Sequence, residues 1–450
     1  MTVASPSSGT LVAASGPLEV APDPIDLFAT AFAAGLESGL WLQPIEDFAM
    51  VGIGRTWSVR GEGPDRFRAV AEAWEGRLAG ARMSGDAQPR LIGGLGFTGE
   101  VPDAAPWSPF GAASMVLPEL ILVREGGVAT LTTSFIDDGS ADAQSGRERQ
   151  WSELVASART ARAERQAPAS TPTPLSVVGE RPDRLIWDRL VDRFAGAVGR
   201  GRLDKVVLAR RVDLESAGDI DVVAAVRWLA ARSPNSTTYA VARGGSVFFG
   251  ATPERLVATQ NKGFQTVAVA GTVRHDEDPV VEAALAAELR ASDKDREEHE
   301  IVVDALRALL EPVAAEIQIA ANPVVARFGT VQHLVTTVSG RLRDRSGILR
   351  LAGLLHPTPA VGGEPRNLAL ELIADNEGFD RGWYAGPLGW VGADGDGEFV
   401  VALRCAVVSG RCASLFAGCG IVADSDATRE WEESRNKMQV VAAALGEVRS

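Results

Sequence analysis

The sequence predicts an α+β fold, in which largely antiparallel sheets are covered by helices on the outside. Two observations support this class. Predicted strands follow one another through hairpin turns at Gly126-Gly127, at Gly244-Gly245 and near Asn261-Lys-Gly263. In addition, no Rossmann or P-loop fingerprint occurs between a predicted strand and a helix, so the nucleotide-binding βαβ folds are not expected.

The composition is that of a globular protein large enough to bury a sizeable core, with 450 residues, 46% of them apolar and 23% charged. Its 59 acidic residues outnumber the 45 basic ones, and the net charge is -14. A protein with this charge lacks the basic surface that neutralises nucleic-acid phosphates or binds an anionic membrane. We therefore expect neither nucleic acid nor a membrane among its partners.

Three cysteines and four histidines are too few for a disulfide framework or a soft-metal cage, and they favour a reducing compartment. No Lys or Arg precedes Arg55, so the basic region of a signal peptide is missing. No run approaches the roughly 18 apolar residues of a membrane helix. These features predict a soluble, cytoplasmic protein.

The first part of the chain predicts a tail followed by antiparallel structure. Residues 1–24 are rich in Ser, Ala, Pro and Gly without a hydrophobic period, which predicts a disordered tail. Apolar residues from Phe67 to Leu78 recur at helical spacing. Strands are predicted over Leu91–Phe97, Ser114–Val123 and Val128–Phe135, and a helix over about 145–165. The prolines of 166–174 end that helix and separate a sheet-forming half, 25–174, from a second half, 175–450, within one integrated body.

The second half predicts further helices and strands. A helix with Leu190 and Phe194 on its apolar side stops at Gly199 and leads into the strand Lys205–Arg210. A helix over about 220–232, two hairpins and a long helical segment over about 278–316 follow. The remaining chain predicts a strand over Val331–Val338, short helices near 346 and 367, three strands between 383 and 422, and a closing helix over 428–445.

The closing helix carries the first chemical signal. Glu430, Glu433 and Lys437 lie on one of its faces, after the N-capping side chains of 424–426. Taken alone, this pattern is typical of a solvated helix surface. The preceding Gly418-Cys-Gly420 favours a functional interpretation, because glycines in a strand indicate that another group approaches the backbone closely.

Three further positions are candidates for chemistry. A carboxylate from the helix that begins at Lys294-Asp-Arg-Glu-Glu-His-Glu300, meeting Glu433, would form a hard-oxygen site suited to Mg²⁺. Lys205 shares a strand face with Val207, so in a buried strand its amine would be desolvated and able to act as a base, whereas an edge strand would leave it solvated. Arg404 stands alone among apolar strand residues and needs an anionic partner.

Read in order, the motifs resemble those of the chorismate-utilising enzymes. The segments that carry the resemblance are Lys205-Val-Val-Leu-Ala-Arg210, Gly250-Ala-Thr-Pro-Glu-Arg-Leu256, Ala270-Gly-Thr272, Lys294-Asp-Arg-Glu-Glu-His299, Gln332-His-Leu-Val-Thr336, His356-Pro-Thr-Pro-Ala-Val361, Tyr384-Ala-Gly-Pro-Leu-Gly-Trp390, Leu403-Arg-Cys405 and Gly418-Cys-Gly-Ile-Val422 through Glu430-Trp-Glu-Glu-Ser-Arg-Asn-Lys437. The resemblance covers about residues 180–445 strongly and the front half loosely. It implies a single large α+β body with two sheets packed face to face and helices outside.

Within this family the motifs are most similar to those of the members that isomerise chorismate to isochorismate with water and Mg²⁺. Lys205 then matches the base that activates water for attack at ring carbon 2. Glu254 matches the acid that protonates the hydroxyl leaving ring carbon 4, and His333 matches a histidine near that hydroxyl. Such a pair requires a lysine that burial makes less basic and a glutamate that burial makes less acidic.

The resemblance also implies the ligands of the metal and of chorismate. Glu298 and Glu433 match Mg²⁺ ligands, and Glu430 matches a residue that reaches the metal through water. The positions that match substrate-binding residues are Gly271 and Thr272 for the ring acid, Tyr384, Arg404, Gly418 and Lys437 for the enolpyruvyl carboxylate, and Ala360 and Val361 for the pocket wall.

Three positions distinguish this chain among its relatives. Lys205 stands where ring-aminating members usually carry Gln, and Ala270 stands where members with a covalent lysine carry it, so water is the expected nucleophile. Ala360 stands where aminating and salicylate-forming members tend to have Thr, which favours release of isochorismate.

Three alternatives stay open: a salicylate synthase that goes on to eliminate pyruvate, an ammonia-dependent anthranilate synthase component, and a catalytically silent chorismate-binding paralogue. The protein is expected to act as a monomer. Its product is expected to feed menaquinone, a catechol siderophore or salicylate, according to the neighbouring enzymes.

Overall fold

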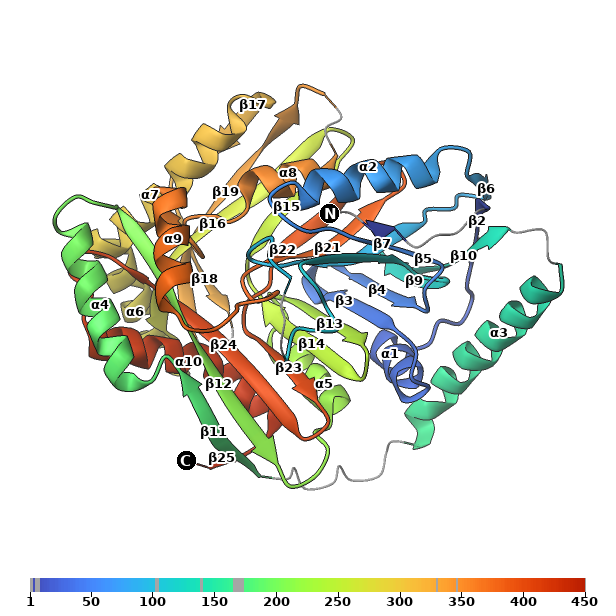
Figure 1. Ribbon diagram of the computed structural model, residues 1–450, viewed down its shortest axis with the longest axis horizontal. Helices are drawn as coiled ribbons and strands as arrows, with labels where there is room; N and C mark the ends of the chain where they lie inside the picture. Colours follow the sequence, from blue (N-terminus) through green and yellow to red (C-terminus); the bar gives the residue numbers. More distant parts are fainter. Residues whose placement is uncertain are drawn as a thin grey trace.

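The computed structural model describes residues 3–4, 9–101, 105–137, 141–164, 174–328, 331–344 and 347–449. Over these residues, two large sheets form the centre of the molecule, and helices lie around them (Figure 1). Every strand pair is antiparallel except β2 with β6 and β11 with β25. The predicted α+β class, with two largely antiparallel sheets, is confirmed.

The first sheet has eleven strands in the described residues. In spatial order they are β1 (Val3–Ala4), β5 (Trp57–Arg60), β8 (Ala113–Leu117), β7 (Arg90–Leu95), β21 (Pro387–Gly392), β22 (Gly397–Val401), β15 (Arg255–Gln260), β16 (Gly263–Arg274), β19 (Val331–Leu342) and β17 (Ala314–Ile319), with β18 (Val324–Phe328) also paired with β19. The four strands at one end come from the front half of the chain, and the rest come from the back half.

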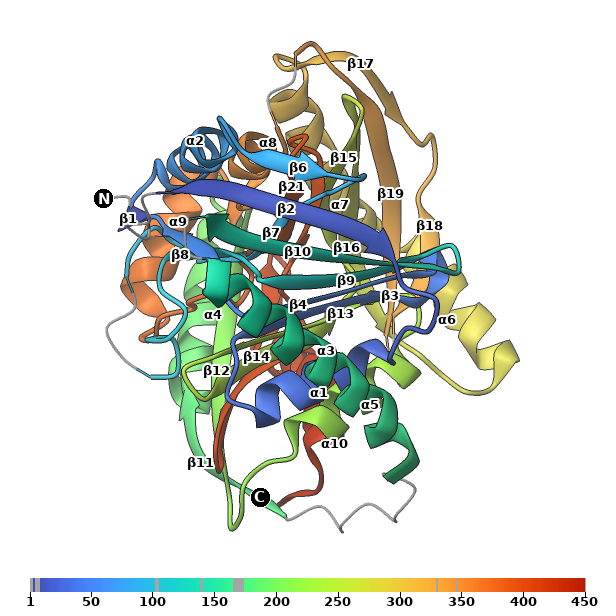
Figure 2. The ribbon, with the colours of Figure 1, turned by 90° about the vertical axis from the view of Figure 1, so that its right-hand side faces the viewer.

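The second sheet has fourteen described strands. In spatial order they are β25 (Val448–Arg449), β11 (Leu175–Arg181), β12 (Lys205–Ser216), β24 (Cys412–Ile421), β23 (Cys405–Ser409), β14 (Ser246–Thr252), β13 (Thr237–Arg243), β3 (Ser38–Gln43), β4 (Phe48–Ile53), β9 (Leu120–Glu125), β10 (Val128–Asp137), β2 (Thr10–Pro17) and β6 (Arg82–Ser84), with β20 (Gly363–Glu364) paired with β12. Figure 2 shows the strands of the front half continuing the sheet of the back half from β3 onward.

The helices of the described chain pack on the outside of these sheets. They are α1 (Pro24–Ala33), α2 (Arg66–Leu78), α3 (Ala141–Glu164), α4 (Arg184–Val198), α5 (Val222–Arg232), α6 (Pro279–Ala291), α7 (Asp293–Leu310), α8 (Ile348–Leu355), α9 (Arg366–Asn376) and α10 (Ala427–Leu445), with a short 3₁₀ helix at Pro44–Glu46. Acidic side chains cap several of them, and Asp426 accepts hydrogen bonds from the first backbone N–H groups of α10. No helix within the described ranges combines the length and the apolar character needed to cross a bilayer.

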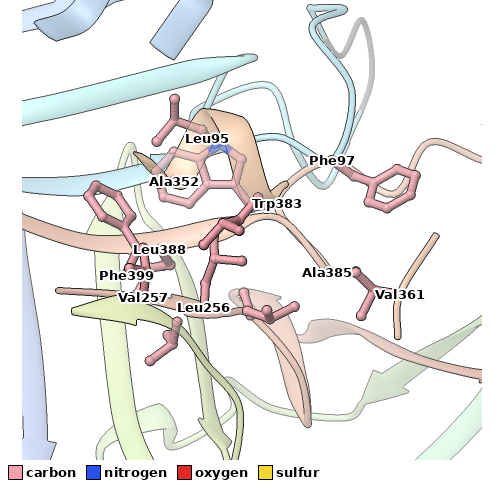
Figure 3. Packing of buried hydrophobic residues seen from close by; sticks show 14 of the residues in the cluster. Leu95, Phe97, Leu256, Val257, Ala352, Val361, Trp383, Ala385, Leu388 and Phe399 are labelled. Atoms are coloured by element: carbon pink, nitrogen blue, oxygen red, sulfur yellow. The ribbon is translucent and has the colours of Figure 1, made fainter. Parts of the chain in front are cut away.

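The hydrophobic core has two layers, which follow from the two-residue period of the strands. In β3, Trp41 belongs to the cluster that includes residues of both sheets, whereas Leu40 and Leu42 belong to the cluster beneath α1 and α5. Figure 3 shows part of the first cluster, where Leu95 and Phe97 of the front half lie with Trp383 and Leu388 of the back half. The two halves therefore share one core.

Three predicted segments differ in the structure. The prediction of a disordered tail over 1–24 is wrong for Thr10–Pro17, because β2 pairs with β10 and buries Leu11 and Ala13. The single strand predicted over Ser114–Val123 is divided at Pro118 into β8 and β9, which belong to different sheets. The long helix predicted over 278–316 is divided at Ser292, whose hydroxyl caps α7, and its last part forms β17.

Other expectations hold at the level of single elements. The helices predicted near 67–78, 185–198, 220–232 and 428–445 are present, as are the three hairpin turns. Four strands occupy 383–422 where three were expected. Within the proline-rich boundary at 166–174, all residues but Pro174 lie outside the described chain.

Candidate active site

One cavity gathers the predicted site residues. All of them except Glu430 line it, and they come from both sheets and from α7 and α10. The cavity lies where β12 and β24 face β16 and β19. A larger cavity near Arg90, Arg255 and Trp390 contains none of the predicted residues. The sequence motifs thus converge on one place, although they span more than half of the chain.

Lys205 begins β12, which lies between β11 and β24 inside the sheet rather than at its edge. Its side chain is 1% exposed, and Nζ donates a hydrogen bond to Glu298 Oε1 at 2.7 Å. Burial works against the charged form of Glu298, but the ammonium groups of Lys205 and Lys437 outweigh it and lower the pKa of Glu298. Lys205 and Glu298 therefore form a buried ion pair on the cavity wall.

Gly420 of β24 makes room for this ion pair. A Cβ atom at that position would lie 2.5 Å from Lys205 Cε and 2.8 Å from Glu298 Oε1. Gly418, two residues earlier, would place a Cβ 3.0 Å from the Tyr384 hydroxyl. The two glycines that the sequence singled out are thus the places where side chains of the site approach the strand.

Glu254 lies in the turn between β14 and β15 and is 5% exposed. Burial raises its pKa to about 7, although the charges of Lys205, Arg404 and Lys437 act in the opposite direction. The direction agrees with the sequence expectation for an acid. At neutral pH a substantial fraction of Glu254 carries a proton and can donate it into the cavity.

His333 of β19 is held in one orientation by contacts to both of its ring nitrogens. Nδ1 lies 3.0 Å from the backbone oxygen of Gly271, and Nε2 lies 3.2 Å from Arg404 Nη2. Burial lowers the pKa of His333 to about 3, and the charges of Arg404 and Lys437 add to this. The ring is therefore neutral, and because a carbonyl oxygen only accepts, Nδ1 carries the proton and Nε2 accepts from Arg404.

The cationic side of the cavity is formed by Arg404 and Lys437. Arg404 is in the left-handed backbone region, with φ of 49°, which is costly for a residue with a side chain and is typical of functional positions. Lys437 of α10 donates to the backbone oxygen of Gly418 at 3.0 Å and pairs with Glu433 Oε1 at 2.5 Å. Tyr384 stacks on Phe416 at 5.4 Å between ring centroids.

The acidic side of the site is formed by α10 and α7. Possible metal-binding atoms of Glu430, Glu433 and Cys419 all lie within 4.8 Å of one another. Burial, reinforced by the charge of Glu433, raises the pKa of Glu430 to about 7. Burial also raises the pKa of the Cys419 thiol, which keeps it protonated. The two carboxylates are the hard-oxygen ligands of this group. Glu298, which forms an ion pair with Lys205, lines the cavity together with Glu433.

Sequence reasoning missed several contributors. Lys294 Nζ lies 3.6 Å from Glu430 Oε1, and Phe416 and Leu403 form apolar parts of the cavity wall. Asp295 packs against Gly271, since a Cβ added at Gly271 would lie 3.0 Å from the Cβ of Asp295. Lys294 and Leu403 stood inside motifs that the sequence singled out, whereas nothing in the pattern around Phe416 marks it as a site residue.

Comparisons with known proteins identify the family of this chain. A family model described as "Chorismate binding enzyme" matches residues 4–446. The chain is 36% identical over 439 residues to the salicylate biosynthesis isochorismate synthase of Pseudomonas aeruginosa, covering 97% of this chain and 90% of that protein. It is 30% identical over 418 residues to the isochorismate synthase MenF of Bacillus subtilis, covering 90% and 87%. The solved structure of MenF, the menaquinone-specific isochorismate synthase from Escherichia coli, matches with a TM-score of 0.79 at 28% identity, covering 98% of this chain and 96% of that one.

The fold and the site therefore define an enzyme, and the chain belongs to the chorismate-binding enzyme family. The relatives just named are isochorismate synthases, which are isomerases within that family. The resemblance drawn from the motifs is confirmed, and so is the predicted enzyme class.

Proposed function

We propose that this protein is an isochorismate synthase that converts chorismate to isochorismate. Water adds at ring carbon 2, the ring double bonds shift, and the hydroxyl of carbon 4 leaves as water, so atoms balance without a co-reactant. The observation that carries the proposal is the pair of Lys205 and Glu254, both buried on one cavity that also holds carboxylates and cations. The names of the relatives support the same reaction.

Lys205 and Glu254 divide the proton transfers between them. Lys205 is the base that takes the proton of the attacking water, and Glu298 holds its amine in place through the hydrogen bond at 2.7 Å. Glu254 donates its proton to the departing hydroxyl, which its pKa of about 7 permits at neutral pH. His333 lies beside Arg404 as a neutral donor and acceptor that orients the guanidinium.

Charged groups of the cavity fit a dianionic substrate. Arg404, Lys437 and Tyr384 are suited to one carboxylate, and the backbone around Gly271-Thr272 is suited to the other. Ala360 and Val361 close the wall of the pocket. Although the protein as a whole has a net charge of -14, these local cations determine the field that the substrate meets.

The donor set also fits Mg²⁺. Glu433 and Glu430 present clustered carboxylate oxygens, and Glu298 adds a third carboxylate to the same region. In this proposal Glu298 and Glu433 would hold the ion directly and Glu430 would hold it through water. The bound ion would supply positive charge for the ring carboxylate of chorismate. The protonated Cys419 thiol is unsuited to Mg²⁺, which prefers oxygen ligands.

The test is the identity of the product. Purified protein is incubated with chorismate, with and without Mg²⁺, and the products are separated by chromatography. Isochorismate formed only with Mg²⁺ supports the proposal. Pyruvate and salicylate appearing without an added lyase would reassign the protein as a salicylate synthase, which Ala360 argues against. A product that requires ammonia would reassign it as an aminating enzyme, which Lys205 argues against.

A further inference from the structure

The front half of the chain contributes no side chain to the wall of the active-site cavity, whose lining residues in the described chain run from Lys205 to Lys437. Front-half residues nevertheless contact this wall and its supports: Trp107 packs on Phe416 at 5.2 Å between ring centroids, and Phe97 contacts the groups that hold the wall. Phe97 follows β7 and is 3% exposed. Its backbone N–H donates to the oxygen of Gly382 at 2.7 Å, and its own oxygen lies 3.0 Å from His356 Nε2. Figure 3 shows Phe97 in the same buried cluster as Val361 and Ala385.

The ring of Phe97 lies over the guanidinium of Arg381, with the carbon atom of that group 4.2 Å from the ring centroid. Arg381 is 3% exposed, and a buried guanidinium is costly unless its donors are used. Here Nε donates to Glu377 Oε2 at 2.7 Å, and Nη2 donates to Glu377 Oε1 at 2.5 Å. Glu377 in turn accepts a hydrogen bond from the backbone of Ala209 in β12 at 2.7 Å.

The remaining donors of Arg381 bind the cavity wall itself. Nη1 donates to the backbone oxygen of Val361, and Nη2 donates to the backbone oxygen of Val207, each at 2.8 Å. Val207 lies two residues after Lys205 in β12, and Val361 follows Ala360 in the loop after α8. The backbone oxygen of Arg381 also accepts from the N–H of Tyr384 at 3.0 Å. The buried side chain of Arg381 is therefore joined to two separate parts of the cavity wall, and its backbone is joined to a third.

We propose that Arg381 is a positioning residue for the isomerisation, and that Phe97 connects the front half to the active site through Arg381. The inference rests on the proposed function. Arg381 fixes the separation between the strand that carries Lys205 and the loop that carries Ala360 and Val361. Phe97 packs against the face of the guanidinium and restricts its movement. Because small errors in the placement of an acid and a base reduce the rate strongly, loosening this contact lowers kcat without removing a catalytic group.

The test compares two substitutions of equal size in the front half. Phe97→Leu removes the ring above Arg381, whereas Phe110→Leu removes an equally buried ring that contacts Trp107, Phe248 and Trp383. Both variants are expected to lose thermal stability. Only Phe97→Leu is expected to lower kcat, by about tenfold or more, while Phe110→Leu keeps kcat within about twofold. Glu377→Gln, which keeps the shape but removes the charge that orients Arg381, is expected to lower kcat in the same way with native circular dichroism.

Wild-type protein assayed with chorismate under the same conditions gives the baseline. If wild type forms isochorismate and the two phenylalanine variants lose kcat equally, or neither loses it, the positioning role is wrong and the proposed function stands. If wild type forms no isochorismate, the proposed function fails and this inference fails with it. A selective loss of kcat in Phe97→Leu supports the inference.

Discussion

The front and back halves of the molecule contribute differently to the same two sheets. Each sheet contains strands from both halves, and one hydrophobic core joins them. The described cavity wall, however, is made by the back half alone. In the back half, glycines and buried charges occur where side chains must approach the strands. In the front half, buried Trp and Phe side chains provide packing. Folding is therefore shared between the halves, whereas the proposed chemistry is confined to one of them.

The largest effect is expected from the proposed acid and base, which both lie in the back half. Glu254→Gln keeps the size of the side chain and Lys205→Gln shortens it, and each removes the proposed proton transfer. Each variant is expected to lose about 10³-fold in kcat while keeping a native circular dichroism spectrum. Steady-state assays with chorismate and Mg²⁺ measure the loss. Nearly full activity in either variant would remove that residue from the mechanism.

A matched pair of glycine substitutions compares the halves directly. Gly420→Ala places a Cβ 2.5 Å from Lys205 Cε. The flexible lysine side chain can move aside, which costs little folding free energy but displaces its amine from the position needed for catalysis. We expect a loss of about 10²-fold in kcat. Gly76→Ala in α2 meets nothing within 4 Å and is expected to keep full activity and to raise stability by about 0.5–1 kcal/mol. Equal activity in both variants would contradict the assigned position of Lys205.

The pH dependence of the reaction follows from Glu254. Its pKa is raised to about 7, and the form that donates a proton is the protonated one, which is lost as the pH rises. Above pH 7 we therefore expect kcat/KM to fall by about tenfold per pH unit. Rates measured between pH 6 and pH 9 test this expectation. A profile that stays flat up to pH 9 would show that Glu254 is not the acid.

The smallest effect on activity is expected from the packing of the front half. Trp74 is 2% exposed, stacks on Trp57 at 6.1 Å, and donates to the backbone oxygen of Gly392 at 3.0 Å. Trp74→Phe removes volume and this hydrogen bond, so we expect unfolding to become easier by about 2 kcal/mol. Denaturant titration measures the stability, and kcat is expected to be unchanged. A large loss of kcat at unchanged stability would contradict the division between the halves.

The sequence could predict those features of both halves that depend on local signals. Strand alternation, glycine hairpins and helical spacing predicted most elements of both halves, because these signals are local. The motifs identified Lys205, Glu254 and Arg404, which the structure brings to one cavity. Local signals failed at Thr10–Pro17, where a strand of small residues is stabilised by pairing with β10, and at Pro118, where one apolar run serves two sheets.

The sequence also could not predict which charged side chains pair with one another. Nothing local indicates that Glu298 pairs with Lys205, or that Arg381 binds the backbone of Val207 and Val361. These contacts join segments that are far apart in the chain, so they follow from the packing of the two sheets. The proposed metal and the monomeric state stay predictions from the resemblance.

The origin of the new oxygen tests the central claim, that a buried amine and a buried carboxylic acid add water to one ring position while removing a hydroxyl from another. Chorismate is incubated with the protein and Mg²⁺ in H₂¹⁸O for a short time, and the isochorismate is analysed by mass spectrometry. The account predicts one ¹⁸O atom, located in the hydroxyl on ring carbon 2. Isochorismate without the label, or no isochorismate at all, would contradict it.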